Sequence, residues 1–313
     1  MKKPFNALNL IMFSLLFAVS CATAYRFEYA SFESAALERR MNYSVYLPPG
    51  WDGLKKLPLV VFLHGGGDDE ECFDEFESFR EIDQWIEKGM LDPFILAVPD
   101  GELGFWANWH DGTHRYEDYV IEDVIPHIRK NYPVLKDRES THLMGISMGG
   151  AGAVYMSVNR PEVFASASVI SAPVYDTDQV MEFLQGFFWK HFANVQRIFG
   201  PPERERVARQ NIYNRLKSAS DLRGVRLLVA AGTQDRHGIF ESTEAFHRHM
   251  KEREIPHRYM VFKGGHRWVD WRPILPVVLC SQVNTPGSCS LPRDDYYELE
   301  EFLPGGEPIR PGG

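Results

Sequence analysis

The amino-acid sequence predicts an α/β fold with a mostly parallel central sheet and helices on both of its faces. Short apolar runs alternate along the chain with amphipathic helical segments. The apolar runs at 57–67 and 94–101 are continuous and end in glycine, as is typical of strands buried on both faces. The chain has 313 residues, 44% of them hydrophobic, which is long enough to bury a large core. We interpret residues 25–285 as one domain.

The remaining elements follow in the order that this fold class requires. The apolar residues of 116–132 recur on one helical face, which predicts a helix despite Pro126. The next three segments are predicted as a strand, a helix and a strand, at 141–147, 149–160 and 164–171. The last three have the same strand, helix and strand pattern, at 225–232, 241–254 and 257–262.

A long segment interrupts this alternation. Residues 176–222 separate two predicted strands by more than one crossover helix needs, and they are rich in aromatic residues. The segment is either an extra helix pair packed on the core or a cap at the sheet edge where ligands bind, and we predict a helical cap. Toward its end the chain becomes rich in proline, glycine and acidic residues, so 286–313 is predicted to be a poorly ordered tail.

The first 24 residues have the pattern of an export signal. Lys2 and Lys3 precede an apolar run at 10–19, and "ATA" at 22–24 is an Ala-x-Ala cleavage site. The apolar run is too short for a comfortable membrane span. We therefore predict a signal peptide at 1–24 and a secreted or periplasmic protein. The alternative is a lipoprotein anchored through Cys21.

Charge and cysteine spacing argue against several classes of function. The formal net charge of −9 does not suit a nucleic-acid binder, which needs clustered Lys and Arg. No cysteine spacing typical of zinc is present, and His110 and His114 lack a third ligand pattern beside Asp111. We predict neither a metal nor a cofactor. In an oxidising compartment, Cys280 and Cys289 are able to close a short loop.

A serine lies between glycines where a predicted strand becomes a helix. Ser147 stands in "GISMGG", with the strand before it and the helix after it. A turn this sharp strains the backbone of the serine and needs small neighbours, here Gly145 and Gly149. It exposes the hydroxyl at the carboxyl edge of the sheet, beside a helix N-terminus that favours developing negative charge. We predict that Ser147 is a nucleophile, which requires a base within hydrogen-bond reach.

A histidine and an acid follow the last two predicted parallel strands. His266 stands in "FKGGHRW", and Asp235 ends "LLVAAGTQD". Both loops belong to the edge of the sheet where Ser147 is expected, so His266 is the predicted base and Asp235 the acid that orients it. Asp176 and Asp178, which follow an earlier strand, are the alternative acids.

Two backbone N–H groups are needed to bind a developing oxyanion. Met148 follows the nucleophile and supplies one of them. "HGGG" at 64–67 leaves its strand at the same edge and is predicted to supply the other from Gly66. A phosphate-binding loop is the rival interpretation, but neither GK[ST] nor GxGxxG is present.

Six motifs together resemble one known family. They are "VVFLHGGGDDE", "AVPDGELGFWANW", "YEDYVIEDVIPHI", "LMGISMGGAGA", "AAGTQD" and "FKGGHRW". In this order, over about 40–280, they resemble the putative-esterase family of α/β-hydrolases, which holds feruloyl and acetyl-xylan esterases, tributyrin-type esterases, S-formylglutathione hydrolases and mycolyltransferases. The resemblance implies an α/β-hydrolase fold, a triad of Ser147, Asp235 and His266, and an oxyanion hole at Gly66 and Met148. The export signal departs from the cytosolic S-formylglutathione branch.

The expected function is an exported serine carboxylesterase that hydrolyses short-acyl or aromatic-acyl esters. The alternatives are an acyltransferase of the same fold and a non-catalytic carbohydrate-binding relative. The expected partner is a small or polysaccharide-linked ester, without nucleic acid or a stable membrane span. Trp106 and Trp109, in the loop 104–112, and Trp189, in 176–222, offer flat apolar faces for sugar rings or aromatic acyl groups. The other interpretation of these aromatic residues is that they fill the core.

Overall fold

The structure is a computed structural model that describes residues 27–186, 195–236, 238–285, 288–289 and 295–303. The predicted signal peptide, with Cys21, lies outside these residues, and so does Trp189. In the described part of the chain, no helix has both the length and the apolar character needed to cross a membrane.

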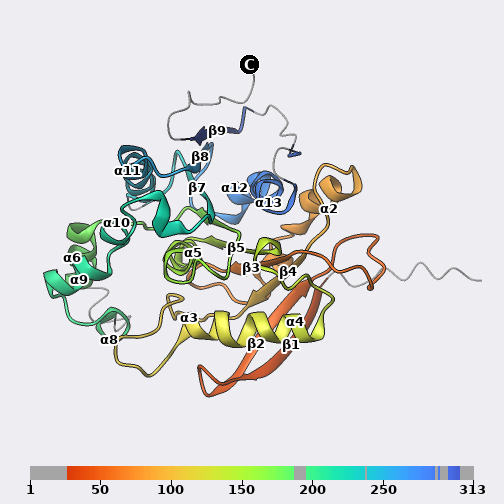
Figure 1. Cartoon of the computed structure of the whole chain (residues 1–313), viewed down its shortest axis with the longest axis horizontal. Helices are drawn as coiled ribbons and strands as arrows, with labels where there is room; N and C mark the ends of the chain where they lie inside the picture. The colour runs from red at the N-terminus through yellow and green to blue at the C-terminus, as the bar shows by residue number, and fades with distance from the viewer. Residues whose placement is uncertain (1–26, 187–194, 237, 286–287, 290–294, 304–313) are drawn as a thin grey trace, which may run out of the picture.

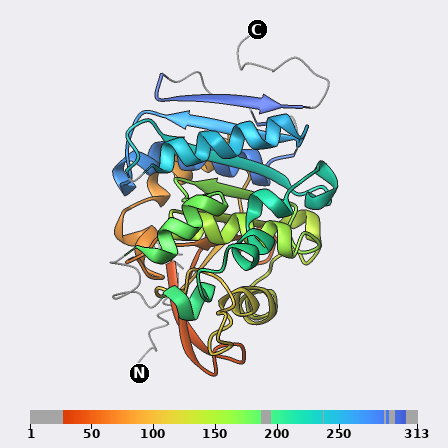
Figure 2. The same cartoon turned by 90° about the vertical axis from the view of Figure 1, so that its left-hand side faces the viewer.

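The described residues form a nine-stranded sheet in the order β1-β2-β4-β3-β5-β6-β7-β8-β9. The six central strands from β4 to β8 are mutually parallel, and β1, β2 and β9 are antiparallel to their neighbours. Figures 1 and 2 place the β1–β2 hairpin at one edge of the sheet and β9 at the other. The strands are β1 (Phe27–Ser34), β2 (Arg39–Tyr46), β3 (Leu59–Leu63), β4 (Ile95–Pro99), β5 (Thr141–Ile146), β6 (Ser166–Ile170), β7 (Arg226–Gly232), β8 (His257–Phe262) and β9 (Tyr297–Phe302).

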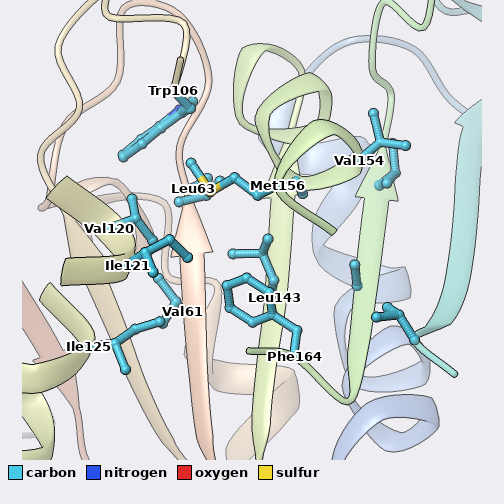
Figure 3. Close-up of a cluster of buried hydrophobic side chains, with 14 of the residues drawn as sticks. Val61, Leu63, Trp106, Val120, Ile121, Ile125, Leu143, Val154, Met156 and Phe164 are labelled. Carbon is cyan, nitrogen blue, oxygen red and sulfur yellow. The ribbon is translucent and has the colours of Figure 1, made fainter. Parts of the chain in front are cut away.

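Helices cover both faces of the sheet, as predicted. Successive residues of a strand point to opposite faces, so Val61 of β3 belongs to one buried cluster and its neighbour Phe62 to the other. The first cluster packs against η1, α4, α5 and α11, and Figure 3 shows part of it. The second packs against α2, α12 and α13. These helices are α2 (Phe79–Glu87), η1 (Tyr119–Val124), α4 (Ile125–Asn131), α5 (Met148–Asn159), α11 (Ile239–Glu252), α12 (Trp268–Trp271) and α13 (Leu275–Val283), and the short helical segments outside the insertion are α1 (Cys72–Glu75), α3 (Tyr116–Asp118), η2 (Arg138–Ser140) and η4 (Arg272–Ile274).

The helix expected at 116–132 is present as α3, η1 and α4 in succession. Its middle part, η1, is π-helical, and Pro126 lies in the first turn of α4 directly after it. A proline is tolerated there because the N–H that it lacks has no α-helical acceptor in a first turn.

The insertion between β6 and β7 is helical where the structure describes it. Leu184, Val195 and Val207 form a small apolar cluster of its own. It also contacts the loop after β4, because the Phe105 ring lies 5.2 Å from the Phe199 ring, centroid to centroid. Its elements are α6 (Thr177–Gln185), α8 (Val195–Phe199), α9 (Arg204–Gln210), α10 (Ile212–Arg215) and η3 (Ala219–Leu222).

The prediction of a poorly ordered tail at 286–313 is wrong for Tyr297–Phe302. These residues form β9, which pairs along its whole length with β8. An edge strand needs little apolar sequence, and within β9 Leu299 alone is fully buried. Ion pairs from Lys251 and Arg258 to glutamates of β9 add to the pairing. A disulfide between Cys280 and Cys289 ties the preceding segment to α13.

Candidate active site

Ser147 stands on a strained turn between β5 and α5. Its φ of 56° and ψ of −118° lie in a region that residues with a side chain rarely adopt. Only glycine fits at two positions of this turn. A Cβ on Gly145 would overlap the backbone of Gly149, and a Cβ on Gly149 would overlap the carbonyl of Leu63. The Ser147 N–H donates to the Ile170 carbonyl at 2.8 Å. Strand, turn and helix together therefore fix the hydroxyl at the carboxyl edge of the sheet.

The structure brings Ser147, His266 and Asp235 together through two hydrogen bonds. His266 Nδ1 lies 2.8 Å from Asp235 Oδ1, and His266 Nε2 lies 2.8 Å from Ser147 Oγ. The carboxylate only accepts, so Nδ1 carries the proton and Nε2 is free to accept the serine hydroxyl. The Asp235 side chain is completely buried, whereas the His266 ring is partly open to solvent.

The alternative acids lie elsewhere in the structure. Asp176 is the N-cap of α6, where its carboxylate accepts from the N–H groups of Asp178 and Gln179. Asp178 forms an exposed ion pair with Arg204. Neither carboxylate has a hydrogen bond to His266 among the described residues.

The two predicted oxyanion donors lie on neighbouring loops. Met148 is the first residue of α5, so its N–H has no acceptor within the helix. A Cβ on Gly66 would lie 3.9 Å from Met148 Sδ, and a Cβ on Gly65 would lie 3.6 Å from Ser147 Cβ. Within the described residues, the Gly66 N–H donates to no protein acceptor. The arrangement leaves two amides beside Ser147 available to an oxyanion.

A buried histidine that the sequence did not single out holds the glycine loop in place. His64 is fully buried, with Nδ1 2.8 Å from the Gly65 carbonyl. Its Nε2 accepts from the Gly101 N–H at 2.8 Å. These two contacts place the ring proton on Nδ1. This bond ties the loop after β3 to the loop after β4.

The prediction that Trp106 offers a face to substrate is wrong. Only 1% of Trp106 is exposed, and its indole N–H donates to the His64 carbonyl at 3.1 Å. A Cβ on either Gly101 or Gly152 would overlap the indole, which shows how tightly the ring is enclosed. Figure 3 shows it with Leu63 at one end of a core cluster. Trp106 supports the site from within the core.

A cavity of about 450 Å³ lies against the glycine loop. Trp109 is one of its walls, and the Trp109 ring packs on the His114 ring at 4.3 Å between centroids. The cavity is lined by Gly67, Asp68, Glu102, Leu103, Trp109, His114 and Tyr116.

The wall of this cavity has an acidic character. Asp68 lies beside the glycine loop, and burial raises the pKa of its carboxyl group. Glu102 accepts hydrogen bonds from Arg39 and Tyr116. The positive charge of Arg39 is therefore already paired with a carboxylate. On the outer side, Arg197 forms an ion pair with Asp111. Within the described ranges, His, Cys, Asp and Glu side chains do not gather in threes as metal ligands.

Comparisons with known proteins agree with this architecture. The family model described as "Putative esterase" matches residues 34–280. An esterase of Mycobacterium tuberculosis is 27% identical over 264 residues, which cover 77% of this chain and 56% of that protein. The chain thus spans about half the length of the curated relatives that it matches.

Solved structures of esterases share the fold. A ferulic acid esterase superposes with a TM-score of 0.67 at 21% identity, covering 81% of this chain and 95% of that one. A fluorophosphonate-binding serine hydrolase of Staphylococcus aureus superposes with a TM-score of 0.65 at 21% identity, covering 83% of this chain and 98% of that one. Since the family model covers nearly all of the described sheet, the chain has the α/β-hydrolase fold and belongs to the "Putative esterase" family.

Proposed function

We propose that the protein is a serine esterase that acts through Ser147, His266 and Asp235. The observation that carries this proposal is the unbroken hydrogen-bonded chain from Ser147 Oγ through the His266 ring to the buried Asp235 carboxylate. A serine hydroxyl needs a base of this kind to act as a nucleophile at neutral pH.

The proposed reaction proceeds in two halves. His266 Nε2 takes the proton as Ser147 Oγ attacks the ester carbonyl, and the N–H groups of Gly66 and Met148 bind the oxyanion. The imidazolium then protonates the leaving alcohol, which departs and leaves an acyl-enzyme. In the second half, a water molecule gives a proton to His266 Nε2 as it attacks the carbonyl of the acyl-enzyme. The imidazolium then returns the proton to Ser147 Oγ, and the carboxylic acid leaves. No cofactor is required.

We further propose that the cavity beside Gly67 binds one part of the ester, and that the substrate is a short-acyl or aromatic-acyl ester of a neutral sugar or polysaccharide. Trp109 and Tyr116 supply aromatic surface, while Asp68 and Glu102 supply acceptors for hydroxyl groups. The same carboxylates disfavour an anionic leaving group such as glutathione. The solved ferulic acid esterase of this fold supports an aromatic acyl group.

We also propose that the protein is exported. The pattern at 1–24 supports this proposal. The disulfide between Cys280 and Cys289 supports it independently, since such bonds persist in oxidising compartments. A lipid anchor at Cys21 is the alternative route to the same compartment.

The substrate proposal is tested with a panel of esters and the purified protein. Initial rates are measured on acetylated xylan, methyl ferulate, tributyrin, a long-chain triglyceride and S-formylglutathione. We expect the first two to give the highest kcat/KM, because acetylated xylan offers sugar hydroxyls to the carboxylates of the cavity and methyl ferulate offers an aromatic ring to Trp109 and Tyr116. A clear preference for the long-chain triglyceride or for S-formylglutathione contradicts the proposed substrate class.

A further inference from the structure

A second network of hydrogen bonds converges on the far oxygen of Asp235. Asp235 Oδ1 faces His266, whereas Oδ2 accepts from Ser171 Oγ at 2.7 Å and from the Gly232 N–H at 3.1 Å. Ser171 Oγ in turn lies 2.9 Å from Trp271 Nε1. An indole N–H only donates, so the serine hydroxyl accepts from Trp271 and directs its own proton at Asp235. The hydrogen bonds therefore run in one direction, from Trp271 through Ser171 to Asp235.

The backbone at Ser171 is strained to make this contact. Ser171 directly follows β6, is fully buried, and has a φ of 48°. Its N–H donates to the Ala230 carbonyl at 2.7 Å, which holds it beside the end of β7. A left-handed φ is unfavourable for a residue with a Cβ, and glycine avoids this cost. The backbone conformation at this position therefore favours glycine. A serine there offsets the unfavourable φ with the hydrogen bond from its hydroxyl to Asp235.

Trp271 contacts both His266 and Ser171. It belongs to α12, five residues after His266, and is buried. Its ring meets the His266 ring edge-on, with centroids 5.0 Å apart. One side chain therefore packs against the base and donates to the hydroxyl that holds the acid.

We propose that Ser171 and Trp271 are positioning residues that hold the Asp235 carboxylate for His266. The proposal rests on the esterase function proposed above. With Oδ2 bound by the Ser171 hydroxyl, the carboxylate does not rotate, and Oδ1 stays directed at His266 Nδ1. The hydroxyl dipole also offsets part of the carboxylate charge that the imidazolium experiences. Ser171 thus acts on the reaction through Asp235 and has no contact with substrate.

The test compares Ser171→Ala with a matched control, Ser168→Ala. Ser168 lies on β6, the strand that Ser171 follows, and is equally buried, but within the described residues its hydroxyl has no hydrogen-bond partner. On p-nitrophenyl acetate, we expect Ser171→Ala to lower kcat about 10- to 100-fold, as for loss of a hydrogen bond to a charged group, and to change KM less than twofold. Ser168→Ala retains the parental kcat and KM.

The pH dependence separates positioning from a merely structural role. Without the Ser171 hydroxyl, more of the carboxylate charge acts on the imidazolium and stabilises it. The acidic limb of the kcat/KM profile therefore moves to higher pH in Ser171→Ala and stays in place in Ser168→Ala. Simple loss of folded protein would lower the profile without moving it.

Two further variants complete the test. Ser171→Gly removes the hydroxyl and suits the left-handed φ, so it folds even if the alanine variant does not, and it shows the same loss of kcat. Trp271→Phe removes the N–H that donates to Ser171, together with part of the ring that packs on His266, and lowers kcat less than Ser171→Ala does. In the double variant Ser171→Ala/Trp271→Phe, the second change costs less than it does in the parent protein, because the N–H of Trp271 acts on Asp235 through the serine.

The outcomes distinguish this proposal from the esterase proposal. An active parent protein, with Ser171→Ala and Ser171→Gly matching Ser168→Ala in kcat and pH profile, contradicts the positioning role alone. Strictly additive losses in the double variant contradict the route through Ser171. A parent protein that neither hydrolyses the ester nor reacts with a fluorophosphonate contradicts the esterase proposal, and the positioning role with it.

Discussion

At the scale of single residues, the site depends on which carboxylate meets His266. Asp235 is buried and receives donors at both oxygens, whereas Asp176 caps a helix and Asp178 pairs with Arg204 at the surface. A buried, fully bonded carboxylate keeps one orientation, and the imidazole tautomer that it imposes leaves Nε2 free for Ser147. The three aspartates therefore have separate roles that substitution distinguishes.

Asp235→Asn should leave KM within about threefold of the parent value and lower kcat on p-nitrophenyl acetate by roughly 10⁴-fold. An amide at this position favours the wrong tautomer of His266 without changing the shape of the site. Asp178→Asn is the matched control and should keep the parental rate, because its carboxylate is exposed and pairs with Arg204. If Asp178→Asn were the crippling change, the acid assignment would be wrong.

At the scale of elements, two separate interactions hold the end of the chain. The disulfide links α13 to the segment before β9, and β9 pairs with β8. β9 lies at the edge of the sheet away from β1 and β2, where Glu300 pairs with Lys251 of α11. The disulfide lies on the other face of the sheet from α11, where Cys280 contacts Met90. The stability of the chain end is therefore sensitive to redox conditions, and that of the β9 edge is sensitive to the charges between α11, β8 and β9.

Replacing Cys289 by serine should lower the free energy of unfolding by about 2 to 3 kcal/mol, the chain-entropy value for a loop closed over nine residues. Urea unfolding with and without dithiothreitol measures it. The reductant should shift the parent protein to the midpoint of the variant and leave Cys289→Ser unchanged. An unchanged parent midpoint in dithiothreitol would show that the bond contributes nothing to stability.

The pair His247 and His257 should make this edge sensitive to acid. His247 Nδ1 lies 2.8 Å from His257 Nε2, and burial, with the neighbouring His257, lowers the pKa of His247 to about 4. Burial also lowers the pKa of His257. Lys251 and Tyr259 also face the pair, and Glu300, whose carboxylate lies 3.7 Å from His247 Nε2, opposes the shift.

Because the unfolded chain binds protons at these histidines near their ordinary pKa and the folded chain does not, the free energy of unfolding should be highest above pH 6.5. It should fall as the pH decreases toward 4. Urea unfolding at several pH values measures the slope. His247→Gln should flatten the slope between pH 6.5 and 4, and a slope equal to that of the parent would remove the histidine pair as its cause.

The sequence predicted the central strands because parallel strands buried on both faces are continuous apolar runs, as in β3, β4 and β5. It did not identify β1 and β2, whose exposed and buried positions mix, or β9, whose acidic composition resembles a tail. Ser147, Asp235 and His266 were recognisable because each closely follows a predicted strand. The partnerships of His64, Ser171 and Trp271 were not, because they join residues 30 to 100 positions apart through tertiary contacts that leave no local pattern.

At the scale of the whole molecule, residues from four loops meet at one edge of the parallel sheet. The loops after β3, β5, β7 and β8 supply the glycine amides, the serine, the acid and the histidine in turn. The carboxyl ends of parallel strands meet at one edge, so distant positions in the sequence converge there. The insertion between β6 and β7 packs on the loop after β4, next to the cavity that Trp109 lines.

The central claim is that Ser147 is the nucleophile, and its covalent labelling tests this claim most directly. The protein is incubated with a fluorophosphonate, digested and mapped by mass spectrometry, alongside Ser147→Ala and His266→Ala. We predict one label per chain, on Ser147, with no label and at least 10⁴-fold less ester hydrolysis in Ser147→Ala, and markedly slower labelling in His266→Ala. A label on another residue, or a Ser147→Ala variant that keeps a tenth of the parental activity, would contradict the account.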